Sequence, residues 1–218
     1  MAYSKVLANK YAINRNRYKS ADNFLDAFIK KAGIKGKTIL DFGCGDGSET
    51  ARFISMKAKS VVGVDPSAEM VRLAKERKLT NAVFIKNNGK TISLKNNQFD
   101  LVYSRYVLHY IKDLGSSFKE ISRVLKKGGH FIAILQTLTN NPKLVNRSVP
   151  INLGKGKNMI KFKIFSKSPD EVKTALEKAK LKLVRLDEVE NEDAQIDPKY
   201  KFKNKFKKTT YILLARKA

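Results

Sequence analysis

The stretch DFGCGDG, residues 41–47, combines three glycines at alternate positions with two aspartates, and it directly follows a short apolar run. Glycine-rich turns between a strand and a helix usually bind phosphates. The spacing of these glycines differs from the dinucleotide-binding fingerprint, which needs two residues between its second and third glycines. Asp41 and Asp46 would also repel a pyrophosphate. The turn therefore predicts a ligand that carries positive charge and no phosphate.

S-adenosylmethionine meets these conditions, because it carries a sulfonium, an ammonium and one carboxylate. Gly43 and Gly45 would let its methionine part approach the backbone closely. The start of the next predicted helix, at Ser48, can face its carboxylate. Asp41 offers negative charge to its ammonium group.

A further carboxylate, Asp65, comes at the end of the next apolar run. At the end of a second parallel strand, an acidic side chain can accept hydrogen bonds from both hydroxyls of a ribose. The alternative is that Asp65 caps the helix that begins after Pro66.

The elements that must position these residues alternate along the chain, which predicts a parallel sheet with right-handed crossovers. Strands are expected at residues 38–42, 60–65, 82–86, 99–104, 130–135, 181–189 and 210–216, and helices at 21–31, 48–55, 67–78, 113–126 and 169–180. Lys126–Gly129 predicts the end of the fourth of these helices, with cations followed by a glycine cap. Residues 140–158, with two prolines and two glycines, are expected to form a loop or lid.

Four stretches occur in order along the chain: ILDFGCGDGSETARFI, VVGVDPSAEMVRLAKER, QFDLVYSRYVLHYI and ISRVLKKGGHFIAIL. They resemble the motifs of class I S-adenosylmethionine-dependent methyltransferases, most closely the group of ubiquinone-biosynthesis-type and other small-molecule enzymes. The strong resemblance covers residues 35–135. It implies an α/β fold: a Rossmann-like three-layer sandwich around a seven-stranded, mostly parallel sheet with an antiparallel last strand. Residues 1–34 would form an N-terminal helical segment, and residues 35–218 a single domain.

The resemblance also assigns residues to the cofactor S-adenosylmethionine, whose product is S-adenosylhomocysteine. Those expected to contact it are Asp41, Gly43, Cys44, Gly45, Asp65, Pro66, Met70, Asn88, Gly89, Ser104 and Arg105. Met70 fits core packing equally well. Asn88 stands where the family often has an acidic residue near the adenine amino group, so this contact departs from the pattern; an amide oxygen can still accept from that group.

Candidate catalytic residues follow the fourth strand, where Tyr106 and His109 would lie near the transferred methyl group. His109 is the best base by its intrinsic pKa. The alternative is a structural histidine held by the backbone, with catalysis by alignment of the substrate alone. His130 is expected to be structural. No cluster has metal-ligand spacing, so no metal is predicted.

The formal net charge of the chain is +25, and 35 of its 45 basic residues are lysines. This excess indicates either an anionic partner or a coding bias that favours lysine. The segment KYKFKNKFKK, residues 199–208, interleaves lysines with aromatics, which suits single-stranded nucleic acid or simply a solvated connection. Tyr11 and Tyr18 are candidates for direct contacts to the ligands.

Three functions remain open at this stage. The favoured one is methylation of a small molecule, of which an anionic one is a reasonable guess. An RNA or ribosomal-protein methyltransferase and a non-catalytic cofactor-binding protein are the alternatives. The single cysteine and the absence of a long apolar run or leader-like segment predict a cytoplasmic protein without membrane insertion; the oligomeric state stays open.

Overall fold

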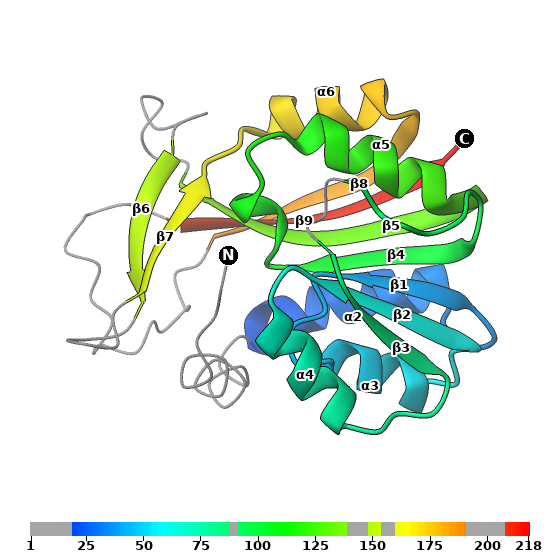
Figure 1. Ribbon diagram of the computed structural model, residues 1–218. Helices are drawn as coiled ribbons and strands as arrows, with labels where there is room; N and C mark the ends of the chain where they lie inside the picture. Colours follow the sequence, from blue (N-terminus) through cyan, green and yellow to red (C-terminus); the bar gives the residue numbers. More distant parts are fainter. Residues whose placement is uncertain (1–18, 88–90, 139–147, 154–159, 191–207) are drawn as a thin grey trace.

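The computed structural model describes residues 19–87, 91–138, 148–153, 160–190 and 208–218, and it shows a sheet covered by helices on both faces (Figure 1). The strands are β1 (Thr38–Phe42), β2 (Ser60–Asp65), β3 (Ala82–Lys86), β4 (Phe99–Arg105), β5 (Leu125–Leu138), β6 (Ser148–Leu153), β7 (Ile160–Phe165), β8 (Leu181–Glu190) and β9 (Lys208–Lys217). The helices are α2 (Lys19–Ala32), α3 (Ser48–Ser55), α4 (Ala68–Glu76), the short 3-10 helix η2 (Leu108–Tyr110), α5 (Leu114–Val124) and α6 (Pro169–Lys178).

The main sheet has seven strands in the order β3-β2-β1-β4-β5-β9-β8. Strands β1 to β5 pair in parallel, and β9 is antiparallel to both of its neighbours, β5 and β8. This topology confirms the predicted fold class. The strand order reverses between β1 and β4, and in open sheets of this kind ligands bind beyond the carboxyl ends of the strands at such a point.

Alternate side chains of each central strand enter two separate cores. In β4, Leu101 and Tyr103 face α2 and α3, while Val102 faces α5 and α6. Phe28 of α2 and Phe118 of α5 are fully buried on opposite sides of the sheet. Burial on both faces explains why the sequence of these strands is continuously apolar rather than alternating.

The boundary between α5 and β5 differs from the prediction. The helix ends at Val124, and the segment Lys126–Gly129, expected to cap it, already belongs to β5. The pairing of β4 with β5 shifts between Phe99 and Leu101, so extra residues of β5 oppose this short stretch of β4. The left-handed Gly128, with φ 74°, therefore accommodates an irregularity in the strand instead of a helix terminus.

The predicted loop 140–158 is also partly wrong, because β6 lies within it. β6 pairs with β7 in antiparallel fashion as a separate two-stranded sheet. This sheet stands beside the carboxyl end of the main sheet in Figure 1, and β7 contacts η2. Pro150 is unusual within a strand, but both strands of a two-stranded sheet are edge strands, in which proline is tolerated.

The helix predicted before β1 is confirmed as α2. Tyr11 and Tyr18 lie outside the described residues, and so do residues 199–207 of the basic segment. Lys208, the last residue of that segment, begins β9.

Candidate functional site

The glycine turn leaves β1 at the carboxyl edge of the sheet, where the strand order reverses. Gly43 and Gly45 have φ values of 83° and 53°, in the left-handed region that favours glycine. A Cβ on Gly43 would lie 2.1 Å from Cγ2 of Val107, whereas one on Gly45 would meet nothing within 4 Å. Gly43 therefore lets the turn pack against the segment after β4, and Gly45 faces open space.

The backbone amides of this turn are already used inside the protein. Those of Gly43 and Cys44 both donate to the carbonyl of Val64, at 2.8 and 3.0 Å. The amide of Gly45 donates to Oδ2 of Asp65 at 3.0 Å. A phosphate-binding turn instead directs its N–H groups at the ligand, so this one is not arranged to hold a phosphate.

Asp65 joins the ends of β1 and β2. Its Oδ1 accepts from the amide of Ser67 at 2.8 Å, while its Oδ2 accepts from Gly45. Burial raises the pKa of Asp65, and these two backbone hydrogen bonds oppose that shift. The residue that caps α4 is Ser67, whose Oγ accepts from the amide of Met70 at 3.3 Å. Each oxygen of Asp65 keeps a lone pair for a ligand hydroxyl.

Asp41 and Cys44 lie on the buried side of the turn. Asp41 accepts a hydrogen bond from the hydroxyl of Thr50 at 2.7 Å. Burial, followed by the nearby charges of Asp41 and Asp65, raises the pKa of the Cys44 thiol. The thiol is thus neutral and a poor nucleophile, and the expected contact of Cys44 with the cofactor stays a prediction.

Asp46 closes the start of α3. Its Oδ1 accepts from the Ser48 amide at 3.3 Å and from the Ser48 hydroxyl at 2.8 Å. The other oxygen of Asp46 receives Nη2 of Arg77 at 2.5 Å. The Ser48 amide is therefore bonded within the protein, and the expectation that the start of α3 faces the cofactor's carboxylate stays a prediction.

A buried ion pair, which sequence reasoning missed, fixes the end of β4 against α3. Nη1 of Arg105 lies 2.8 Å from Oε1 of Glu49, and both side chains are at most 10% exposed. The guanidinium of Arg105 also stacks over the ring of Tyr106, 5.5 Å from its centroid. Tyr106 has a φ of 57°, a left-handed conformation that is strained for a residue with a bulky side chain. The one available signal was Glu49 itself, a charge on the helix face that also carries the buried Phe53.

Ser104, the second-last residue of β4, is fully buried, and its Oγ has no hydrogen-bond partner within the described part of the chain. An unsatisfied buried hydroxyl is uncommon and points to a missing partner. Together with the open space at Gly45 and the remaining acceptor capacity of Asp65, it provides polar groups that suit an aminoacyl nucleoside. The residues present therefore fit S-adenosylmethionine.

The other residues predicted to contact the cofactor differ in their location. Pro66 is exposed directly after Asp65, at the edge of the site. Met70 is 2% exposed, which agrees with the alternative of core packing. Asn88 and Gly89 lie outside the described residues.

His109 is buried at the site side of the sheet, in η2. Its Nδ1 accepts a hydrogen bond from the backbone amide of Gln136 at 3.3 Å, and its ring lies 4.2 Å from the ring of Tyr110. A nitrogen that accepts from an N–H group is unprotonated, so the proton of neutral His109 is on Nε2. This tautomer leaves no basic nitrogen for a substrate proton, and it supports the structural alternative; the catalytic role of His109 stays a prediction.

Comparisons with known proteins agree with this geometry. Residues 40–133 match the family model described as a methyltransferase domain. The uncharacterized methyltransferase YcgJ of Bacillus subtilis is 30% identical over 125 residues, 55% of this chain and 49% of the relative. The sterol 24-C-methyltransferase erg6 of Aspergillus fumigatus is 32% identical over 141 residues, 59% of this chain and 37% of the relative. An S-adenosylmethionine-dependent methyltransferase structure from Mesorhizobium loti has a TM-score of 0.65 at 22% identity and covers 85% of this chain and 93% of that chain.

This chain resembles class I methyltransferases both in the match of residues 40–133 to the methyltransferase-domain model and in its fold, as the sequence predicted. It spans about half the length of the first curated relatives that it matches.

The described residues contain neither a membrane-spanning helix nor a metal-binding cluster. None of the helices they form is long and apolar enough to cross a membrane. Within the same ranges, no group of three or more His, Cys, Asp or Glu side chains is placed to hold a metal ion.

Replacing Gly43 by alanine tests the close packing of the turn. We expect Gly43→Ala to lower the free energy of unfolding by about 2–4 kcal/mol, through overpacking and the left-handed backbone. Gly36→Ala is the matched control, because Gly36 has a φ of 74° with nothing near its Cβ position. We expect this control to lower the free energy of unfolding by about 1 kcal/mol. In denaturant unfolding, Val107→Ala combined with Gly43→Ala should be less destabilised than the sum of the two single variants. Additive effects would contradict the proposed clash.

Two variants separate the possible roles of His109. Asn places an acceptor oxygen close to the position of Nδ1, so His109→Asn should keep turnover within about threefold if His109 only holds the Gln136 amide. His109→Leu should be destabilised by about 1–3 kcal/mol, since that amide loses its acceptor. Turnover of both variants is measured with cofactor at saturation, alongside thermal unfolding. A loss of turnover above a hundredfold in a stable His109→Asn protein would instead establish proton transfer through the ring.

Proposed function

We propose that this protein transfers a methyl group from S-adenosylmethionine to a small molecule. The proposal rests on the hydrogen bonds and charges of the glycine turn, residues 41–47. The amides of Gly43, Cys44 and Gly45 are bonded within the protein, and the turn also carries or adjoins the carboxylates of Asp41, Asp46 and Asp65. Such a turn disfavours phosphates and favours a cationic nucleoside.

In this proposal the residues of the site bind and orient the cofactor. Asp65 accepts the ribose hydroxyls, and Asp41 provides negative charge on the ammonium side. Gly45 leaves room for the methionine chain, and Ser104 supplies a buried hydroxyl. The cofactor itself provides an activated methyl group, so the protein's main task is to align the acceptor atom and exclude water.

Two observations support the proposal of a small, anionic substrate, one for its size and one for its charge. The sterol methyltransferase relative acts, by its name, on a small molecule. Lys167 lies between β7 and α6 and is 8% exposed; its Nζ donates to the carbonyl of Lys112 at 2.8 Å, close to η2. No carboxylate of the described residues forms an ion pair with it. A buried ammonium without an acidic partner favours an anionic substrate.

The rival functions make different demands on the same chain. An RNA or ribosomal-protein methyltransferase must bring a large substrate to the carboxyl edge, and a non-catalytic protein must bind the cofactor without turnover. The single cysteine, buried as a neutral thiol, supports a cytoplasmic setting for any of them.

Removal of the Asp65 carboxylate tests the ribose contact. We expect Asp65→Ala to weaken S-adenosylmethionine binding by about 1.5–3 kcal/mol, the range for hydrogen bonds to a charged group. Isothermal titration calorimetry measures the affinity. Asp100→Ala is a matched control, because Asp100 also accepts from a backbone amide, that of Thr38, but at the opposite edge of the sheet. Burial raises the pKa of Asp65 above the ordinary aspartate value of roughly 4. When the pH is lowered from neutral, the affinity of the wild-type protein should therefore start to fall before roughly pH 4 is reached. If Asp65→Ala and Asp100→Ala bind equally well, the ribose role is wrong.

The substrate class is tested by incubating the purified protein with S-adenosylmethionine labelled in its methyl group and with fractionated cell extract. We expect label in the small-molecule fraction, with anionic compounds enriched in it. Label in RNA or protein would replace our proposal with the second function. Tight cofactor binding without label in any fraction would support the third.

A further inference from the structure

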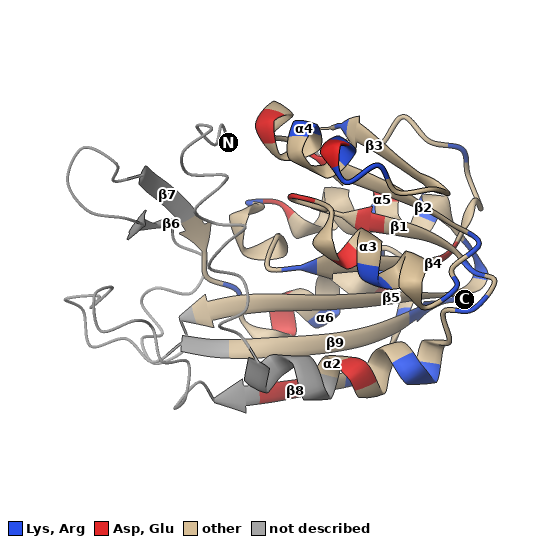
Figure 2. Ribbon diagram, turned by 90° about the horizontal axis from the view of Figure 1, so that it is seen from below, with Lys and Arg blue, Asp and Glu red and all other residues tan. Residues whose placement is uncertain are grey.

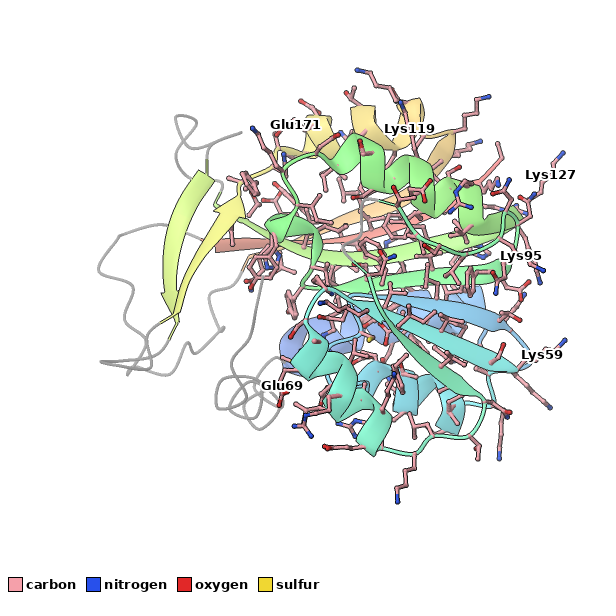
Figure 3. All side chains as sticks on the ribbon, viewed as in Figure 1. Lys59, Glu69, Lys95, Lys119, Lys127 and Glu171 are labelled. Carbon is pink, nitrogen blue, oxygen red and sulfur yellow. The ribbon has the colours of Figure 1, made fainter. Side chains whose placement is uncertain are left out.

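The two edges of the sheet carry opposite charge. Aspartates and Glu49 gather at the carboxyl edge, whereas the connections at the amino edge carry lysines. Lys59 precedes β2, Lys37 precedes β1, Lys127 lies at the start of β5, and Lys180 precedes β8. Figure 2 shows Lys and Arg gathered at the end of the sheet where the C-terminus lies, and Figure 3 shows Lys59 and Lys127 projecting outward there together with Lys95.

Strand register places three of these cations, Lys37, Lys59 and Lys180, along one row. Paired positions run across six neighbouring strands as Val61, Ile39, Leu101, His130, Arg216 and Lys182. Lys59 and Lys37 each come two residues before this row on their strands, and Lys180 does so on β8. Adjacent strands are about 4.8 Å apart, so the row of cations extends over roughly 24 Å.

The amino edge has little negative charge of its own. The segments 35–37, 57–59, 125–129, 180–182 and 216–217 contain no aspartate or glutamate. Asp100, the second residue of β4, accepts from the amide of Thr38 at 2.9 Å and from Nζ of Lys126 at 2.9 Å. Its carboxylate is therefore engaged and offsets few of the surrounding charges.

We propose that this amino edge binds the phosphate backbone of a nucleic-acid duplex. Uncompensated cations repel one another, and a linear polyanion relieves that repulsion while releasing its own counterions. The same cations act on His130: burial lowers its pKa, and so do the charges of Arg216, Lys37 and Lys31.

The chemistry of the edge favours a duplex over other polyanions. A membrane surface is usually held by apolar side chains in addition to charge. Within the described ranges, the exposed large hydrophobic residues are Val83 and Val184, and neither belongs to the connections at this edge. Proteins hold single-stranded nucleic acids with exposed aromatic rings. Neither of the two exposed residues, Val83 and Val184, is aromatic. Lysines act as point charges without the planar fork of arginine, so we expect binding without sequence preference.

This surface has a different role from the active site. β4 has seven residues, so the two edges are about 20 Å apart at roughly 3.3 Å per residue. A duplex on the amino edge would be an anchor that places the enzyme in the cell, and the small-molecule substrate would still enter at the carboxyl edge. The inference is therefore independent of the proposed function.

Two triple variants of equal net charge test the inference. Lys37→Glu, Lys59→Glu and Lys127→Glu together change the edge; Lys75→Glu, Lys119→Glu and Lys173→Glu, on helix surfaces, are the matched control. Binding of fluorescein-labelled duplex RNA and duplex DNA is followed by anisotropy as salt rises. We expect the edge variant to bind at least tenfold more weakly, with a salt slope smaller by about 2–3, and the control within about threefold of wild type. Both duplexes should bind, and a preference between them identifies the natural one.

The outcomes that would overturn the inference are equally definite. Equal losses in both variants would mean that net charge alone attracts the duplex. Edge-dependent binding to vesicles rich in phosphatidylserine, without duplex binding, would assign the edge to a membrane. The affinity for S-adenosylmethionine, measured on the same variants, should match that of the wild type. A negative result in the duplex experiment would therefore leave the proposed function unaffected.

NMR of the two histidines adds a local readout. Phosphates beside the edge favour the imidazolium form, so a bound duplex should raise the pKa of His130 and leave the His109 resonances unchanged. His130→Gln identifies the signal. An unchanged His130 at saturating duplex would contradict binding at this edge.

Discussion

The hydrogen bond from the Gly45 amide to Asp65 is the interaction on which the site depends. It joins the turn after β1 to the end of β2 and so fixes the backbone at the point where the strand order reverses. The bond also determines which ligand the turn can accept, because an amide already bonded to a carboxylate cannot hold a phosphate. One contact thus sets both the shape and the charge preference of the carboxyl edge.

Much of the fold was predictable because its strands are buried on both faces. Continuous apolar runs such as Phe131–Leu135 identify such strands without further context. The boundary of α5 was not predictable, because the glycines at 128 and 129 suit a helix end and a strand irregularity equally well. The decision rests on the pairing of β5 with β4, a long-range contact that local propensity does not contain.

The candidate site was predictable to a different degree. The type and position of Asp65 predicted a carboxylate at the end of β2, and the structure has it there, bonded to the amides of Gly45 and Ser67. Its contact with a ribose stays a prediction. The partners of Asp46 and Glu49 were not predictable: Arg77 and Arg105 are distant in sequence and meet these acids only in the folded chain. For His109, sequence identified a base by residue type, whereas the tautomer depends on the Gln136 amide.

The position of β9 has a consequence for how the protein matures. β9 follows β8 along the chain, yet it lies between β5 and β8 and completes both hydrophobic cores with residues such as Ile212 and Leu213. While the ribosome is still making residues before 208, β5 presents an unpaired edge, a template for association with other chains. The edge of β5 in newly made molecules therefore stays exposed until β9 inserts, and a chaperone that covers β5 during synthesis would protect it from association.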